Sequence, residues 1–335
     1  MTPTDLFAQQ ASNRRRSFWL ISLFVLFFAW IGFGGDLALY VGTRDAPPGE
    51  YRHLVPFFGI LTSLVAAGIC WYSWKQGASR VLWATGATEL TEPATDAEKQ
   101  LVNVVEEMAI ASGLPKPRIW IVPDDDPNAF ATGIEPATAS IAVTRGLLGL
   151  LDRDELQAVI AHEMSHVQNY DTRLMTLLAA MVGAIALVSD GVGRMLRGGF
   201  RSGGRSSGGR KGGNPLAIVL FVVWVVSLLL APVVSRLLAM AVSRKREYLA
   251  DATSAQFTRN PMALASALEK LDAASAPTAT ITRGAAHLCI VDPSGSKLSG
   301  LSGLVGDVLA SHPPIAQRII RLRGMGYQQV KQVSA

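Results

Sequence analysis

Two uninterrupted apolar runs near the N-terminus limit the fold of this chain most strongly. The first extends from Phe18 to Gly35 without a charge, and the second extends from Leu54 to Trp74. Each is long enough to cross a hydrocarbon core of about 30 Å at about 1.5 Å per residue. A cleaved signal peptide is the alternative for the first run, but its apolar stretch exceeds the usual length and no clear A-x-A site follows. We therefore expect two uncleaved transmembrane helices.

Basic residues around these runs set their orientation. Arg14 to Arg16 precede the first run, and Lys75 and Arg80 follow the second; together they outweigh Arg44 and Arg52 in the connecting loop. Cytoplasmic flanks carry an excess of Lys and Arg. The pattern therefore predicts that the N-terminus and everything after the second run lie in the cytoplasm, at the cell (inner, cytoplasmic) membrane.

The composition fits a chain that is part membrane protein and part soluble domain. Hydrophobic residues make up 49% of the 335 residues and charged residues only 17%. The net charge of +5 does not indicate a nucleic-acid partner, because the Lys and Arg residues are scattered or flank apolar runs. Cys70 and Cys289 have no metal-type spacing, so we expect neither a disulfide framework nor a cysteine metal site. The lipid bilayer is an expected partner and nucleic acid is not.

Between Lys75 and Arg173 the pattern changes to that of a soluble domain with helices and strands. The stretch "EKQLVNVVEEMAIASG" places apolar residues on one helical face and ends at Gly113, a predicted C-cap. Short strands are predicted at Arg118–Val122, around Asn128–Thr132 and at Ala139–Val143. The chain then turns into a helix that Asp152 or Asp154 can cap.

This helix carries "AHEMSH", with His162 and His166 one turn apart on the same face and Glu163 beside the first. Two imidazoles at this spacing can bind one Zn²⁺, and the glutamate can act as the general base towards a water molecule that attacks a peptide carbonyl. A surface helix with two incidental histidines is the alternative. The chain has only five histidines, so this pattern is improbable by chance. It indicates a zinc peptidase.

A catalytic zinc needs a third protein ligand. The stretch "SRKREYLADATSAQF" offers Glu247, with Asp251 four residues later on the same helical face. Glu247 would bind the zinc, and Asp251 would accept a hydrogen bond from the distal nitrogen of a ligand histidine. A solvated helix in which Glu247 pairs with Arg244 or Lys245 remains the alternative from spacing alone.

Nearly the whole chain resembles the HtpX-type membrane zinc metallopeptidases, which are related to the CAAX prenyl endopeptidases. The resemblance rests on the two apolar runs, "NAFATG", "HEMSH" followed by Asp171, two further apolar runs, "REYLAD", and "SHPP" with "QRI". It implies a mainly α membrane protein with an α+β, gluzincin-like zincin domain and a small β-sheet beside the motif helix. It also implies one Zn²⁺ per chain, polypeptide substrates that include membrane proteins, and a role in membrane-protein quality control and the stress response.

The same resemblance assigns roles to individual residues. His162, His166 and Glu247 are the implied zinc ligands and Glu163 the catalytic base, with Asp171 and Asp251 in the surrounding shell. Asn128 and Phe130 resemble an extended segment beside the cleft, where a substrate strand adds to a sheet edge. His312 is a candidate for stabilising the transition state, and a histidine held structurally in a Pro-Pro turn with Arg318 is its equal alternative.

Two further apolar runs, Leu174–Ser189 and Pro215–Ser235, lie between the two halves of the site. Because the halves must meet at one zinc, both runs cross the membrane or neither does. The Gly/Ser-rich loop between them carries six basic residues and the first of these runs is short, which argues against a full hairpin. The second is too apolar for a surface loop. We expect four membrane segments, with a shallow or re-entrant pair as the alternative.

The expected division of the chain follows from these runs. Residues 1–16 form a cytoplasmic N-terminus, 17–74 two transmembrane helices, 75–173 the first part of the peptidase domain, 174–240 two further membrane segments, and 241–335 the second part of the peptidase domain. An intramembrane metalloprotease is the less favoured function, because the motif helix carries many charged and polar residues. A catalytically silent membrane adaptor is a third hypothesis, disfavoured by the intact base and ligands.

Overall fold

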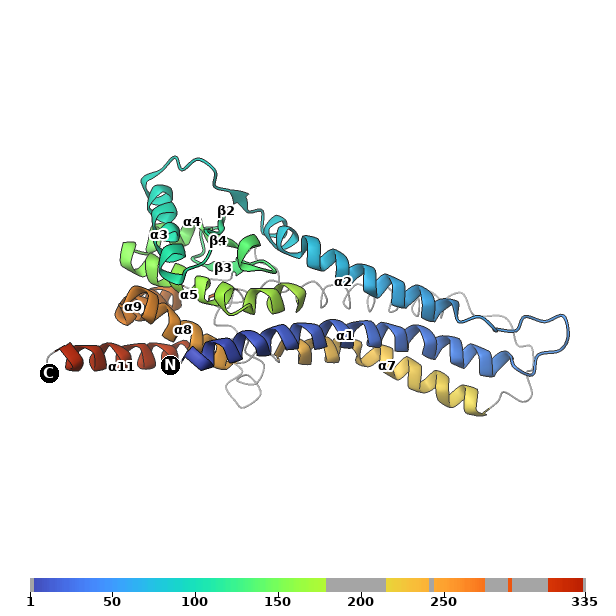
Figure 1. Cartoon of the computed structure of the whole chain (residues 1–335). Helices are drawn as coiled ribbons and strands as arrows, with labels where there is room; N and C mark the ends of the chain where they lie inside the picture. Colours follow the sequence, from blue (N-terminus) through green and yellow to red (C-terminus); the bar gives the residue numbers. More distant parts are fainter. Residues whose placement is uncertain (1–2, 179–214, 241–243, 275–288, 291–312, 334–335) are drawn as a thin grey trace. The chain divides into compact units, whose positions relative to one another are not determined.

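The computed structural model describes residues 3–178, 215–240, 244–274, 289–290 and 313–333 (Figure 1). The chain divides into two compact units. One comprises Met1–Ser17, Trp74–Ala179 and Ala239–Ala335, and the other comprises Phe18–Ser73 and Ala180–Leu238. Most of the predicted run Leu174–Ser189, the Gly/Arg-rich loop after it and His312 lie outside the described residues.

Parts of long apolar helices build the second unit. Helix α1 spans Pro3–Thr43, α2 spans Phe57–Ala84 and α7 spans Pro215–Met240. Within the described residues, Gln10–Thr43 and Phe57–Ala84 are long and apolar enough to cross a membrane, and α7 contributes the shorter apolar stretch Ile218–Ser227. Many large apolar side chains on α1 and α2 are exposed, as expected of surfaces that face lipid. The two predicted N-terminal membrane helices are therefore present as helices.

Glycines allow α1 and α2 to approach closely. A Cβ at Gly32 would overlap Thr62 Oγ1 and the carbonyl oxygen of Phe58, and Thr62 Oγ1 donates to the carbonyl oxygen of Phe28 at 3.0 Å. Small residues at such crossings are typical of membrane helix pairs. At the end of this pair, the buried His53 Nε2 lies 2.6 Å from Asp36 Oδ1. His53 is thus paired with a buried carboxylate.

The first unit contains a four-stranded mixed sheet. Its strands are β1 (Thr88–Glu89), β2 (Arg118–Val122), β3 (Ala129–Thr132) and β4 (Ser140–Thr144), in the order β1-β2-β4-β3. Strands β2 and β4 are parallel, whereas β3 runs antiparallel to β4 at the edge. All residues of β3 and β4 are buried, which explains why β4 reads as a continuous apolar run rather than an alternating one. A 3₁₀ turn at Pro136–Thr138 connects them.

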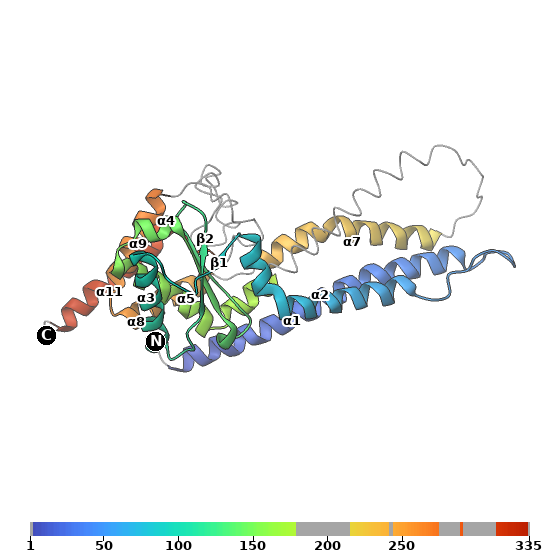
Figure 2. The ribbon, with the colours of Figure 1, turned by 90° about the horizontal axis from the view of Figure 1, so that it is seen from above.

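Helices α3 (Asp96–Ser112), α4 (Arg145–Leu150) and α5 (Arg153–Gln168) accompany this sheet (Figure 2). Helix α5 contacts both α3 and the edge strand β3. Helix α3 begins with a capping box formed by Thr95 and Glu98 and ends at Gly113 in the left-handed conformation, as its sequence predicts. Its apolar face, with Leu101, Val104 and Met108, joins the hydrophobic core between sheet and helices.

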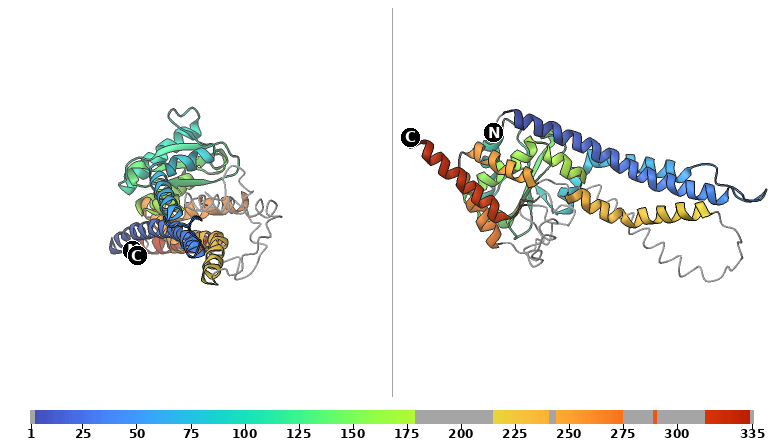
Figure 3. Two further views of the ribbon diagram at one scale, coloured as in Figure 1. Left: turned by 90° about the vertical axis from the view of Figure 1, so that its right-hand side faces the viewer. Right: turned by 90° about the horizontal axis from the view of Figure 1, so that it is seen from below.

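Three C-terminal helices complete the first unit. They are α8 (Arg244–Thr258), α9 (Pro261–Ala274) and α11 (Ile315–Val333), and the orange α9 lies beside the red α11 (Figure 3). Both α8 and α9 contact α5, so the motif helix is enclosed by the second half of the domain. The predicted class, a mainly α membrane protein with an α+β domain and a small sheet beside the motif helix, is confirmed.

Candidate metal centre and active site

Helix α5 is anchored at its N-terminus by a charged network. Asp152 caps the helix, and Glu155 completes a capping box, so Asp152 rather than Asp154 is the cap. The buried Glu155 also accepts hydrogen bonds from Ser266 Oγ at 2.7 Å and from Lys270 Nζ at 2.6 Å, both on α9. These contacts fix the axis and rotation of the helix that carries His162, Glu163 and His166.

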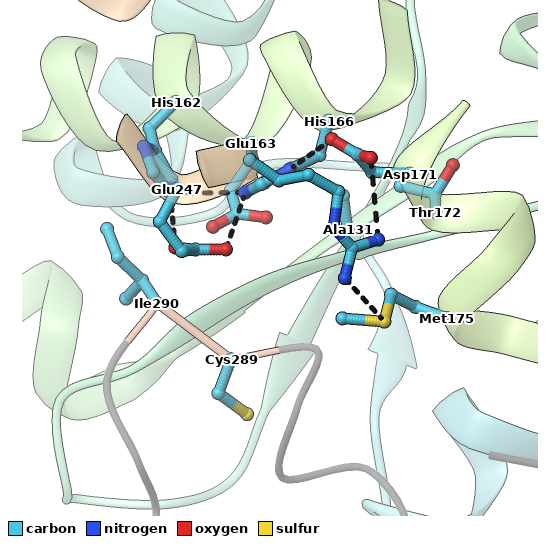
Figure 4. A pocket seen from close by; sticks show the side chains of 11 residues that line it. Ala131, His162, Glu163, His166, Asp171, Thr172, Met175, Glu247, Cys289 and Ile290 are labelled. Atoms are coloured by element: carbon cyan, nitrogen blue, oxygen red, sulfur yellow. Dashed lines mark hydrogen bonds and ion pairs between the residues drawn. The ribbon is translucent and has the colours of Figure 1, made fainter. Parts of the chain in front are cut away.

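Helix α8 packs directly on α5 and brings the third candidate ligand. Ser254 Oγ donates to the carbonyl oxygen of Ala158 at 2.7 Å, which joins the two helices in a fixed register. About two turns before Ser254, Glu247 points towards the two histidines (Figure 4). Its Oε2 lies 3.7 Å from His162 Nε2, and its Oε1 lies 3.7 Å from His166 Nε2. The 3.2 Å separation of the two Nε2 atoms closes the triangle.

This triangle fits a single metal ion. One ligand atom from each of His162, His166 and Glu247 lies within 4.8 Å of the others, in the part of the chain that the structure describes. Two nitrogen ligands at Zn–N distances of 2.0–2.1 Å in a tetrahedral site are roughly 3.3–3.5 Å apart, close to the spacing of the two histidines. Two imidazoles and a carboxylate are also the donor set of a catalytic zinc site with an open position.

Each histidine has a carboxylate at its other ring nitrogen. His162 Nδ1 lies 3.1 Å from Asp251 Oδ1, and His166 Nδ1 lies 3.0 Å from Asp171 Oδ2. Burial alone would lower the pKa of His162, but the nearby carboxylates of Asp251 and Glu247 outweigh it and raise the pKa. Such outer carboxylates orient a ligand imidazole and leave Nε2 directed at the metal. Both aspartates that the sequence places near the site are thus beside its histidines.

Glu163 lies in the pocket next to the histidines and is 1% exposed. Burial, and secondly the charge of Glu247, raise the pKa of Glu163 to about 8, against the opposing effects of His166 and of a hydrogen bond from the backbone of Ala131. A carboxyl group with a pKa near the working pH can both take up and release a proton. Its contact with Ala131 ties it to strand β3 at the sheet edge.

Arg318 is a part of the site that the sequence analysis did not identify. It is fully buried, donates to Asp251 through Nη2 at 2.7 Å and Nε at 2.9 Å, and places Nη2 3.4 Å from His162 Nε2. The motif "QRI" could have pointed to Arg318 as a site residue, but the sequence suggested it only as a structural partner of the Pro-Pro turn. The guanidinium is the cation that neutralises the carboxylates behind His162.

Arg246 is a second missed residue, on the other side of the site. It lines the pocket and is 2% exposed, with Nη1 3.5 Å from Asp171 Oδ1. Because a buried guanidinium is costly without a carboxylate nearby, Asp171 is the group that compensates the charge of Arg246. The sequence feature that could have identified Arg246 is its position in "REYLAD", directly before Glu247.

The remaining predicted site residues are Asn128, Phe130 and His312. Asn128 and Phe130 are buried and do not line the pocket, whereas Ala131, which follows Phe130, does. The edge of β3 is paired with a distant segment: Phe130 bridges Cys289, and the amide of Ile290 donates to the carbonyl oxygen of Ala129 at 3.0 Å. Figure 4 shows Cys289 and Ile290 on the side of the pocket opposite the histidines. His312 lies outside the described residues.

Comparison with known proteins decides the class of this site. The model of peptidase family M48 matches residues 95–326, which contain all of the candidate ligands. This chain belongs to peptidase family M48. An M48 relative from Streptococcus gordonii, called "Protease HtpX homolog", is 37% identical over 96% of this chain and 100% of its own length. Another of the same name from Streptococcus agalactiae serotype III is 41% identical over the same shares.

Among solved structures, the crystal structure of S. mikatae Ste24p is similar, with a TM-score of 0.45 and 20% identity over 91% of this chain and 66% of that one. Membership of family M48 makes the chain a metallopeptidase. Its long apolar helices mark it as a membrane protein. The resemblance stated from the sequence is confirmed.

Proposed function

We propose that this M48 peptidase is a membrane-bound zinc endopeptidase in which His162, His166 and Glu247 hold the metal and Glu163 is the base. The observation that carries the proposal is the convergence of the three side chains at 3.2 to 3.7 Å, with Glu163 in the same pocket. The outer carboxylates Asp171 and Asp251 support it, because ligand histidines in zinc sites are usually oriented in this way.

The reaction is hydrolysis of a peptide bond by water. Bound zinc supplies Lewis acidity, which polarises the scissile carbonyl and lowers the pKa of water. The Glu163 carboxylate takes the proton from the attacking water and returns it to the leaving nitrogen, so the products are a carboxylate and an amine. The pKa of about 8 on Glu163 describes the metal-free site, and a bound cation would lower it towards the carboxylate form that acts as the base. His312 remains a candidate for stabilising the oxyanion, a role that a hydrogen-bond donor near the developing charge would fill.

We propose that substrate enters beside the edge of β3 at Ala131, because the edge at Ala129 and Phe130 is already paired with residues 289–290. Strand addition at a sheet edge uses backbone hydrogen bonds and is therefore tolerant of sequence, which suits an endopeptidase with many polypeptide substrates. Asn128 and Phe130 would support this edge from within rather than touch substrate, because both are buried. Ala131, in the pocket and bonded to Glu163, is the β3 residue nearest the chemistry.

We propose that the site faces the cytoplasm and lies near the membrane surface. Residues 1–17, with the exposed Arg14 to Arg16, belong to the same unit as the candidate site. Along the chain, two helices of membrane-spanning length connect this segment to the rest of that unit. His166 lies eight residues before the apolar run that begins at Leu174, and Glu247 lies twelve residues after the run that ends at Ser235. This position suits cleavage of exposed segments of membrane proteins and misfolded proteins, and hence a role in membrane-protein quality control and stress response.

The test compares purified wild type with Glu163→Gln and Glu247→Ala. We expect Glu163→Gln to retain about one zinc per chain and to lose on the order of 10²-fold to 10⁴-fold in proteolysis of a denatured membrane protein. We expect Glu247→Ala to lose zinc and activity together. Glu106→Gln, at an exposed acid that pairs with Lys116, is the matched control and should resemble wild type.

Each alternative predicts a different result. Full hydrolysis by zinc-loaded Glu163→Gln would remove the base assignment, and unchanged zinc content in Glu247→Ala would remove the third ligand. A catalytically silent adaptor would bind zinc in the wild type without cleaving the substrate. An intramembrane protease would cut within the apolar span of the substrate rather than in its exposed segments, which mass spectrometry of the products distinguishes.

A further inference from the structure

The helical residues that precede the first apolar run form hydrogen bonds with the end of the motif helix and the turn after it. Gln10, Asn13 and Arg14 lie on one face of α1, at i, i+3 and i+4. They bond to the turn that follows α5, residues 168–171: Gln10 Nε2 donates to the carbonyl oxygen of Gln168 at 2.9 Å, and Arg14 Nη2 donates to Tyr170 Oη at 2.8 Å. Both partners belong to the same unit, so these contacts are internal to the peptidase domain.

Asn13 makes the central contact. Its side chain is completely buried, and Nδ2 donates to the carbonyl oxygen of Asn169 at 2.9 Å and to Asp171 Oδ1 at 2.7 Å. The other carboxylate oxygen of Asp171, Oδ2, lies 3.0 Å from Nδ1 of His166. Asn13 therefore occupies one oxygen of Asp171 and leaves the other for the imidazole of His166. Asn13 is thus linked to this candidate ligand through Asp171.

The turn itself needs support. Tyr170 has φ of +58°, a left-handed conformation that a bulky residue rarely adopts. Arg14 lies 4.4 Å above its ring and Arg173 lies 5.0 Å from the ring centre. This unusual conformation reverses the chain so that Asp171 reaches back to His166, five residues earlier. The start of α1 supplies contacts at Gln168, Asn169, Tyr170 and Asp171, which is every residue of the turn.

We propose that Asn13 is a positioning residue of the metal centre: by holding Asp171 it orients His166 for metal binding, so the start of α1 is a working part of the peptidase. The proposal rests on the function proposed above for His166. A buried carboxylate requires donors at both oxygens, and of the donors to Oδ1 Asn13 is closer than Arg246, at 2.7 Å against 3.5 Å. Outer partners of ligand histidines typically change metal affinity or activity by about 10-fold to 100-fold.

The experiment uses the full-length protein in detergent and three single variants. Asn13→Ala removes the donor, Asn13→Asp replaces it by an acceptor of the same shape, and Ser17→Ala is the control. Ser17 is also buried on α1, one turn later, and its hydroxyl donates back to the carbonyl oxygen of Asn13. Zinc affinity is measured by competition with a chromophoric chelator, kcat and KM are measured at saturating zinc, and thermal unfolding is measured after chelation.

We expect Asn13→Ala to weaken zinc binding about 10-fold and Asn13→Asp by more, with kcat reduced and KM little changed. The double variant Asn13→Asp with Asp171→Asn exchanges donor and acceptor, and we expect it to bind zinc more tightly than Asn13→Asp alone. A merely structural role would lower the unfolding temperature of the metal-free protein without this reciprocal rescue.

The outcomes separate this inference from the proposed function. Equal zinc affinity and kcat in Asn13→Ala and Ser17→Ala would overturn the positioning role while leaving the zinc peptidase intact. Loss in Asn13→Asp without rescue in the double variant would also overturn it. Failure of the wild type to bind zinc, or full activity of Glu163→Gln, would instead overturn the proposed function. If Asn13→Asp does not fold, the comparison of Asn13→Ala with Ser17→Ala still decides the question.

Discussion

Asp251 and Arg318 form a buried two-point ion pair, with Arg318 Nη2 2.7 Å from Asp251 Oδ1 and Arg318 Nε 2.9 Å from Asp251 Oδ2. The pair joins α8 to α11 directly behind His162. Arg318 Nη1 also donates to the carbonyl oxygen of Ile290 at 3.2 Å, which fixes the segment paired with the edge of β3. One guanidinium thus connects the histidine, the second half of the domain and the sheet edge.

Removing this guanidinium should destabilise the domain strongly. Arg318→Met leaves Asp251 buried without its cation, and breaking a buried pair in this way costs about 3–5 kcal/mol. Arg323→Met on the same helix removes an exposed partner of Glu269 and should cost less than about 1 kcal/mol. Denaturant unfolding of the metal-free proteins in detergent measures both. Similar losses for the two variants would show that the buried pair contributes no more than a surface pair.

Acid should weaken the same pair. Burial alone would raise the pKa of Asp251, but the charge of Arg318 and the hydrogen bonds from His162 and Arg318 hold it below its ordinary value. The folded protein therefore binds fewer protons at this group than the unfolded chain, so the stabilisation is complete above the ordinary pKa of about 4 and is lost as the pH falls through the lower folded-state value.

The stability difference between wild type and Asp251→Asn is therefore expected to shrink as the pH falls below about 4. Unfolding free energies of the chelated proteins, measured at several pH values, test this. A difference that stays unchanged through the acid range would contradict the ionised pairing of Asp251.

Local patterns in the sequence were sufficient to predict much of the fold. The i, i+4 spacing of His162 and His166 and the cap at Asp152 depend on residues a turn apart, and helix geometry alone relates them. The strand Arg118–Val122 was predicted with its observed bounds. Helix α2 instead continues to Ala84, beyond the apolar run that ends at Trp74, because hydropathy marks the lipid-facing part of a helix and not its end.

Contacts between distant segments could not be predicted in the same way. Arg318 resembles any other arginine of a basic, amphipathic helix, and nothing near it indicates that it meets Asp251. Asn13 precedes a basic cluster and therefore looked like part of a membrane flank, whereas its partner Asp171 lies 158 residues later. Periodicity shows which residues share a helix face, but not which distant element covers that face.

Close packing of α1 and α2 should make Gly32 intolerant of a methyl group. Gly32→Ala would force Thr62 and the backbone at Phe58 to move, and overpacking of this kind costs about 1–3 kcal/mol. Gly68→Ala on α2 has no atom within 4 Å of the added Cβ and should be neutral or slightly stabilising. The comparison uses thermal unfolding in one detergent. Equal unfolding temperatures would show that the two helices do not depend on this close approach.

The path of the chain between the two halves of the site can be tested by labelling a cysteine at Ser206, which lies in the Gly/Arg-rich loop outside the described residues. Helix α7 has 26 residues, about 39 Å at 1.5 Å per residue, which exceeds the hydrocarbon thickness of about 30 Å. With four membrane segments, we expect Ser206→Cys, in a chain lacking Cys70 and Cys289, to react with an impermeant thiol reagent outside intact cells.

Two further cysteines calibrate that labelling. Glu50→Cys, in the loop between α1 and α2, should react from outside, and Glu106→Cys, on the peptidase unit, should react only after lysis. If Ser206→Cys behaves like Glu106→Cys, the chain does not form an externally exposed hairpin and the re-entrant arrangement is correct. The six basic residues of the loop favour that second result, whereas the length and apolar character of α7 favour the first.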